Sequence, residues 1–150
     1  MRSEAECEPR GSTAAARRQD VILAVERCES SFDGLRASVG QLLDKQPDLT
    51  ALLVHNESVL PSLVGVLQQH RRRVPRDISV VAICPDDMAS THGVSFTNIA
   101  IPAQELGTTA VDMALRQLEG QAPTETRLLA PVLTVRSSTE RARPRARATA

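Results

Sequence analysis

Aromatic residues are almost absent from this chain of 150 residues, which contains two phenylalanines, Phe32 and Phe96, and no tryptophan or tyrosine. The hydrophobic core must therefore be built from leucine, valine, isoleucine and alanine. Stacking of aromatic rings on nucleic-acid bases or on sugar rings is nearly excluded, because it needs side chains that the sequence hardly supplies.

A net charge is also lacking, since 18 basic and 18 acidic side chains cancel. No overall field therefore attracts nucleic acid or a membrane surface. No apolar run approaches the roughly 20 residues that span a bilayer, and the N-terminus lacks the apolar segment of a secretion signal. These absences predict a cytoplasmic protein that contacts neither membrane nor nucleic acid.

Paired cysteines and catalytic motifs are missing as well. The three cysteines, Cys7, Cys28 and Cys84, are odd in number and lack CxxC spacing, which favours reduced, inert thiols over a disulfide framework or a metal site. The three histidines share no metal-ligand spacing, and neither a nucleophile elbow nor a phosphate-binding glycine loop is present. The sequence therefore predicts no cofactor, no metal and no catalytic residue.

What the sequence does contain is an alternation of apolar runs and amphipathic segments. The apolar runs do not alternate with polar residues, which is typical of strands buried in a parallel sheet. Strand, helix, strand, helix and strand in this order predict an α/β fold, with a parallel sheet flanked by helices on both faces. The strands are predicted at 21–25, 49–54 and 78–83, and the helices at 34–46 and 58–71.

The second half continues with a loop at 84–95, an extended piece at 96–101, a helix at 102–119 and a final strand at 128–135. Pro131 has no backbone N–H, so this last strand belongs at an edge of the sheet or is broken in two. In the helix at 58–71, Pro61 is best tolerated in the first turn. Ser58 is therefore predicted to be the N-cap.

Composition divides the chain into one domain and two terminal segments. Residues 1–19 lack apolar periodicity and are predicted to be a disordered leader. Residues 140–150 are predicted to be a disordered, basic tail, solvated rather than bound to nucleic-acid phosphates. The domain is predicted at 20–139.

Polar side chains follow two of the predicted strands directly. Asn56 and Glu57 come after the strand at 49–54, and Asp86 and Asp87 come after the strand at 78–83. Ligands of open α/β sheets bind at these carboxyl ends. Asn56 and Glu57 are also suited to the start of a helix, and the two aspartates form either a solvated turn or acceptors for the hydroxyls of a sugar-like ligand.

The order of these pieces resembles the C-terminal half of the effector-binding domain of LacI/GalR-family transcriptional regulators. The resemblance runs from about residue 21 to residue 139, and it depends on a strand closing on Asn56, on Val-Pro-Arg-Asp-Ile-Ser-Val-Val (74–81), on Leu-Gly (106–107) and on Val-Arg-Ser-Ser-Thr (135–139). It implies a partial periplasmic-binding-protein-like type I fold. Residues 21–95 would build most of one subdomain, the helix at 102–119 would belong to the other, and residues 127–135 would return.

The resemblance also implies roles for the four polar residues. Asn56 matches the asparagine of an Asn-Asp pair that contacts effector hydroxyls, and Glu57 replaces the aspartate. The family has Gly-aromatic-Asp-Asp directly after Val-Val, whereas Ala-Ile-Cys-Pro (82–85) stands between here, so Asp86 and Asp87 match only with a shift of two residues. Glu29 stands where family members often have an aromatic residue.

By this resemblance the chain is a sensor and not an enzyme. It is expected to bind a small effector, sugar-like or nucleoside-like, and to form a homodimer through the helices at 34–46 and 58–71. The helix-turn-helix and the first half of the sensor are not in this sequence, so we expect a truncated or mis-started reading frame or a fragment. The apolar face of the helix at 102–119, with Leu106, Ala110 and Met113, is then exposed, docked on its own subdomain or buried in a partner.

Two alternatives belong to other classes of protein. A small α/β enzyme or receiver-like domain would use Asp86 and Asp87 to hold a divalent ion. A stand-alone sugar-binding protein is disfavoured, because the chain has no export signal.

Overall fold

The computed structural model describes residues 23–91, 93–121 and 126–141, and it divides into two compact units, Met1–Asp48 and Leu49–Ala150. In the described part of the first unit, helix α2 (Phe32–Lys45) begins after Ser31, whose hydroxyl accepts the backbone N–H of Gly34 at 3.0 Å. This is an N-cap, which supplies one of the acceptors that the first turn lacks. The helix predicted at 34–46 is confirmed.

The strand predicted at 21–25 is wrong for its described part. Residues 23–25 have no regular secondary structure, and the side chain of Val25 is 58% exposed. Residues 21 and 22 lie outside the described residues, as do the predicted leader at 1–19 and residues 142–150 of the predicted tail. An apolar run becomes a strand only where a neighbouring strand pairs with its backbone, and the described sheet contains strands of the second unit alone.

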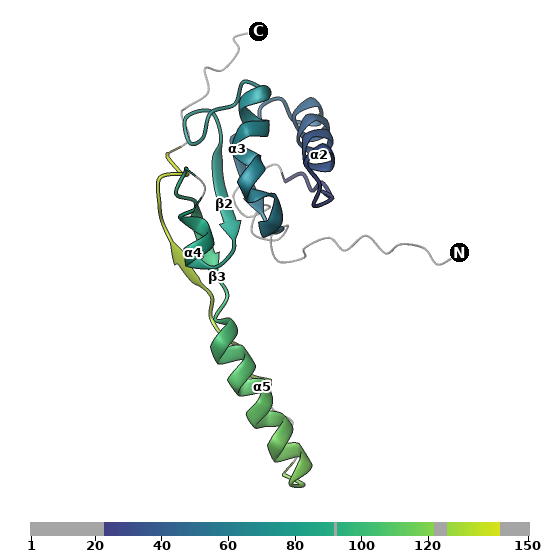
Figure 1. Cartoon of the computed structure of the whole chain (residues 1–150), viewed down its shortest axis with the longest axis vertical. Helices are drawn as coiled ribbons and strands as arrows, with labels where there is room; N and C mark the ends of the chain where they lie inside the picture. Colours follow the sequence, from purple (N-terminus) through teal and green to yellow (C-terminus); the bar gives the residue numbers. More distant parts are fainter. Residues whose placement is uncertain (1–22, 92, 122–125, 142–150) are drawn as a thin grey trace, which may run out of the picture. The chain divides into compact units, whose positions relative to one another are not determined.

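The second unit contains a mixed, mostly parallel sheet with the strand order β1-β2-β3-β4. Figure 1 labels two of its strands, β2 and β3, together with helices of the same unit. Strand β2 pairs in parallel with both β1 and β3, and β4 pairs antiparallel with β3. The predicted parallel arrangement is therefore confirmed for the strands predicted at 49–54 and 78–83, and the extended piece predicted at 96–101 supplies the third parallel strand. Their bounds are Ala51–Val54 for β1, Ser79–Ile83 for β2, Thr97–Ala100 for β3 and Val132–Thr134 for β4.

Strand β4 lies at an edge of the sheet, as Pro131 predicts, but it is shorter than the strand predicted at 128–135. It begins directly after Pro131, because the proline cannot donate to the ladder. Strand β1 lies at the other edge of the described sheet. Leu53 in β1 is 58% exposed, so the prediction of strands buried on both faces is wrong there.

The α-helix that follows β1 begins two residues later than predicted. A 3-10 turn, η1 (Glu57–Val59), precedes helix α3 (Leu60–Gln69), and the N-cap of the 3-10 turn is Asn56. The prediction of Ser58 as the cap is therefore wrong. Pro61 nevertheless lies in the first turn of α3, where its missing N–H leaves no bond unmade. The added 3-10 turn lets Asn56 cap without placing the proline inside the helix.

The core of the second unit is aliphatic apart from Phe96, as the composition predicts. The largest of its fully or almost fully buried apolar side chains come from α3, from β2 and the residue before it, and from the residue before β3. They are Leu60, Leu63, Val66, Leu67, Ile78, Val80 and Phe96.

Two further helices follow β2 and β3. The segment predicted as a loop at 84–95 contains a one-turn helix, α4 (Asp86–Ala89), so the prediction of a loop throughout is wrong. Helix α5 (Ala103–Leu118) confirms the helix predicted at 102–119, and it contains no buried residue. Its leucines and Val111 are exposed in the single chain, and Met113 is half-buried. No helix within the described ranges is both long enough and apolar enough to cross a membrane.

Candidate functional site

The three parallel strands end at the same edge of the sheet, here called the carboxyl edge. The register pairs Val54 with Ala82 and Ile83 with Ile99, so the segments after β1, β2 and β3 all start from this edge. Asn56 and Glu57 follow β1, and Asp86 and Asp87 follow β2. The topology therefore brings the two predicted pairs to one edge, which is where open α/β sheets bind ligands.

Asn56 is half-buried, and its contacts are those of a helix cap. Its side-chain oxygen accepts the backbone N–H of Ser58 at 3.2 Å and also the Ser58 hydroxyl. Glu57 is exposed in the first turn of η1. Asn56 therefore acts as an N-cap in the structure. Contact with effector hydroxyls stays a prediction for both Asn56 and Glu57.

Asp86 is held by an arginine from the C-terminal segment. The Arg136 guanidinium donates through Nη2 to Asp86 Oδ1 at 2.6 Å, and the two side chains are 18% and 59% exposed for Arg136 and Asp86. The hydrogen bond from Arg136, followed by one from Asn98, holds the pKa of Asp86 below its ordinary value. Asp86 is therefore an ionised acceptor, half of which faces solvent.

Asp87 stands next to Asp86 but is fixed differently. Its carboxylate accepts the backbone N–H of Met88 at 2.8 Å, and its carbonyl oxygen accepts the Thr91 hydroxyl at 2.6 Å. These described contacts stay within α4 and the residues directly after it. The solvated turn considered for the pair is replaced by a helical turn with the two carboxylates at its start.

Two residues that the sequence analysis missed complete this arrangement. Asn98 in β3 is fully buried, and its amide nitrogen donates to the carbonyl oxygen of Cys84 at 2.8 Å. Arg136 donates through Nη1 to the Asn98 side-chain oxygen and to the Phe96 carbonyl oxygen. In the sequence, these residues could have been found only as a polar residue within a short strand (Asn98) and as an arginine in the Val-Arg-Ser-Ser-Thr segment at 135–139 (Arg136).

Cys84 lies at the centre of this edge and is buried. Burial raises the pKa of the Cys84 thiol above 9.0, and the negative charge of Glu57 adds to the effect, with smaller contributions from Asp86 and Asp87. Arg136 opposes this rise. The thiol is therefore protonated at neutral pH and a poor nucleophile. Cys28 is also free, and Cys7 lies outside the described residues.

A divalent-metal site finds no support at this edge. Within the part of the chain that the structure describes, no three His, Cys, Asp or Glu side chains come together as a metal site requires. One oxygen of Asp86 already accepts Arg136, which also supplies the positive charge that a metal ion would otherwise provide.

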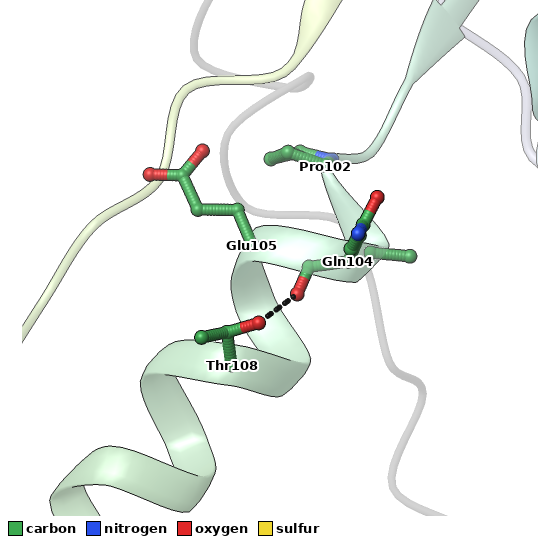
Figure 2. A pocket seen from close by; sticks show the side chains of 5 residues that line it. Pro102, Gln104, Glu105 and Thr108 are labelled. Carbon is green, nitrogen blue, oxygen red and sulfur yellow. Dashed lines mark hydrogen bonds between the residues drawn. The ribbon is translucent and has the colours of Figure 1, made fainter.

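A shallow hollow lies at the start of α5, directly after β3. Its volume is about 480 Å³, and it is lined by Pro102, Ala103, Gln104, Glu105 and Thr108. Figure 2 shows the Thr108 hydroxyl donating to the Gln104 carbonyl oxygen, at 3.0 Å, on the same helical turn. None of the four predicted residues lines the hollow. Because one segment forms the whole of it, it is an open hollow at the surface and not an enclosed pocket.

Comparison with known proteins places this geometry in a family. The family model described as periplasmic binding protein-like domain matches residues 3–139. The repressor CytR of Escherichia coli K12 is 30% identical over 119 residues, which are 77% of this chain and 34% of CytR. The repressor PurR of Aliivibrio salmonicida is 28% identical over 82 residues, 55% of this chain and 25% of PurR.

Solved structures give the same result for the fold. A dimeric Lac repressor with an 11-residue C-terminal deletion has a TM-score of 0.73 at 27% identity, and the match covers 87% of this chain and 48% of that one. The regulator CelR in complex with cellobiose has a TM-score of 0.73 at 24% identity, covering 85% and 40%. The chain spans about a third of the length of CytR. It belongs to the periplasmic binding protein-like domain family, and its relatives there are LacI-family transcriptional regulators.

Proposed function

We propose that this chain is the effector-sensing part of a LacI-type transcriptional regulator. In this proposal residues 20–139 form part of the sensor domain, which binds a small sugar-like or nucleoside-like effector at the carboxyl edge. The chain is not an enzyme, does not itself contact DNA and works in the cytoplasm. The observation that carries the proposal is that polar residues follow two adjacent parallel strands, β1 and β2, at the same edge of the sheet in a fold that matches the family model.

The chemistry of the edge suits a ligand rich in hydroxyl groups. Carboxylate oxygens accept hydroxyl hydrogen bonds that are stronger than those between neutral partners, and Asp86 and Asp87 supply them. Asn56 and Glu57 stand beside them after β1. A sugar-sized ligand is usually enclosed by its pocket to seven-tenths or more, whereas the described residues provide one wall. The second wall is proposed to come from the rest of the regulator, since the match covers 34% of CytR.

A homodimer is the proposed assembly, supported by the dimeric state of the Lac repressor structure. The helices predicted to form the interface do not offer apolar faces for it. In α2, Leu35 and Val39 are buried in the single chain, and in α3 the leucines and Val66 are buried too. The interface is therefore proposed to use the exposed polar side of these helices or other surfaces.

Calorimetric titration with lactose, cellobiose, adenosine and cytidine tests the proposal. At least one of them is expected to bind, with low affinity because the described residues provide one wall, and Asp86→Asn is expected to weaken its binding about tenfold, or about 1.4 kcal/mol. Asp77→Asn is the matched control, because Asp77 is also paired with an arginine, Arg73 at 2.9 Å, but precedes β2 at the opposite edge. Equal losses in the two variants, or no binding by any of the four compounds, would contradict the proposal.

A further inference from the structure

Arg136 connects the C-terminal segment to the carboxyl edge. It lies two residues after β4, and its backbone N–H donates to the Thr97 hydroxyl at 2.9 Å. Its guanidinium contacts the Phe96 carbonyl oxygen at 3.2 Å, the Asn98 side chain and the Asp86 carboxylate. The backbone of Arg136 is therefore fixed to β3, and its guanidinium is fixed to β3, to the residue before β3 and to α4.

The turn that carries Asp86 is fixed by the same group of residues. Asn98 donates to the carbonyl oxygen of Cys84 and accepts from Arg136, which in turn donates to Asp86. Cys84 and Asp86 are two residues apart, so the chain closes a polar ring through Asn98 and Arg136. Because Asn98 is fully buried and Arg136 largely so, the ring has little freedom to rearrange.

The charges around Arg136 determine whether it can also bind an anionic ligand. The other charged side chains placed at the carboxyl edge above are Glu57, Asp87 and Glu105, which are exposed and acidic. An anionic ligand would have to pull Arg136 away from Asp86, which would leave that carboxylate without its partner beside other negative charges. Arg136 is itself largely buried, so it would also have to give up its hydrogen bonds to Asn98 and to the Phe96 carbonyl oxygen in order to reach the anion. The arrangement therefore favours an uncharged ligand.

We infer that Arg136 is a positioning residue, which holds the Asp86 carboxylate in place for ligand hydroxyls and is not a receptor for an anion. The inference rests on the proposed function, since it assigns the ligand class of the same edge. Uncharged polyols and nucleosides are then the ligands, and carboxylated or phosphorylated compounds are excluded. Arg136 acts through Asp86 and does not touch the ligand.

The first test needs no ligand. The carboxyl carbon of Asp86 is followed by NMR while the pH is lowered, in the parent chain and in Arg136→Gln and Arg136→Lys. The pKa of Asp86 is expected to lie below 3.8 in the parent, to rise toward 3.8 or above in Arg136→Gln, and to be largely restored in Arg136→Lys. The other charges at this edge, Asp87 and Glu57, are unchanged in both variants. An unchanged Asp86 titration in Arg136→Gln would overturn the inference.

The second test uses two matched pairs, lactose with lactobionate and adenosine with adenosine monophosphate. The uncharged member of the pair that binds is expected to bind at least tenfold more tightly, and Arg136→Gln is expected to weaken it about tenfold, with partial rescue in Arg136→Lys. Tighter binding of the anion, abolished by Arg136→Gln, would overturn the inference. If no compound binds, the proposed function fails, and the titration alone decides whether Arg136 positions Asp86.

The double variant Asp86→Asn/Arg136→Gln distinguishes the positioning role from a simple folding defect. Asp86→Asn keeps Arg136 and the shape of the side chain. If Arg136 acts through Asp86, Arg136→Gln adds no further loss of affinity in the Asp86→Asn background. Additive losses would show that Arg136 contributes independently and would contradict the positioning role.

Discussion

Helices α3 and α5 both have apolar side chains at helical spacing, yet only one of them is covered. In α3, the side chains of Leu63 and Leu67 are 2% and 0% exposed. In α5, Leu115 and Leu118 are 54% and 84% exposed. Periodicity therefore predicts a helix and the direction of its apolar face, but not whether the same chain supplies a partner for that face.

Two strands, β2 and β4, show the same difference between buried and exposed apolar side chains. In β2, Val80 and Ala82 are fully buried, whereas in β4 Val132 and Leu133 are 59% and 60% exposed. The apolar surface on α5 and β4 is the kind that marks an interaction site. Under the proposed function, this surface is where we expect a partner of α5 and β4 to bind.

The largest expected effect comes from truncating one leucine in each helix. Leu63→Ala should lower the free energy of unfolding by roughly 2–5 kcal/mol, because it removes buried atoms and leaves a cavity. Leu115→Ala, at an exposed position, should change it by no more than about 0.5 kcal/mol. Urea denaturation followed by circular dichroism measures both. A large loss in Leu115→Ala would show that α5 is packed and that the comparison of the two helices is wrong.

A smaller effect is expected where the C-terminal segment joins the core. Ser138 is fully buried; its hydroxyl donates to the Val80 carbonyl oxygen at 2.6 Å and accepts the Thr97 N–H at 2.7 Å. Ser138→Ala leaves both backbone groups without this partner, which should cost about 1–3 kcal/mol. Ser137→Ala is the control, because its hydroxyl is exposed and contacts Ser95 at 3.3 Å. Equal stabilities of the two variants would place the segment outside the cooperative core.

The sequence was sufficient for most of the elements and for the edge of the sheet, because these depend on local pattern. Apolar runs predicted β1 and β2, the extended piece at 96–101 became β3, and Pro131 predicted that β4 is an edge strand. The run at 21–25 was misread because pairing depends on a neighbouring strand that the pattern does not name. The cap was misplaced because both Asn56 and Ser58 suit an N-cap, and only the 3-10 turn between β1 and α3 decides between them.

The candidate site divides in the same way. Asn56 and Asp86 were found because each directly follows a strand. Arg136 and Asn98 were not, since their contacts join residues that are 38 and 50 positions apart, Arg136 with Asn98 and with Asp86. The spacing of residues along the chain does not predict contacts over such distances. From the sequence, an arginine in an Arg-Ser-Ser-Thr segment is expected to be a solvent-exposed surface residue. Only the pairing of β4 with β3 places it beside Asn98 and Asp86.

The smallest effect tests whether α5 unfolds together with the sheet. Gly65 in α3 and Gly107 in α5 are exposed helical glycines, and a Cβ added at either meets no atom within 4 Å. Alanine should stabilise each helix by about 0.5–1 kcal/mol, because glycine loses more conformational freedom on folding. If α5 unfolds on its own, Gly65→Ala raises the midpoint of the cooperative transition by that amount, while Gly107→Ala raises only the helical signal. Equal shifts of the midpoint would mean that α5 is coupled to the core in spite of its exposed face.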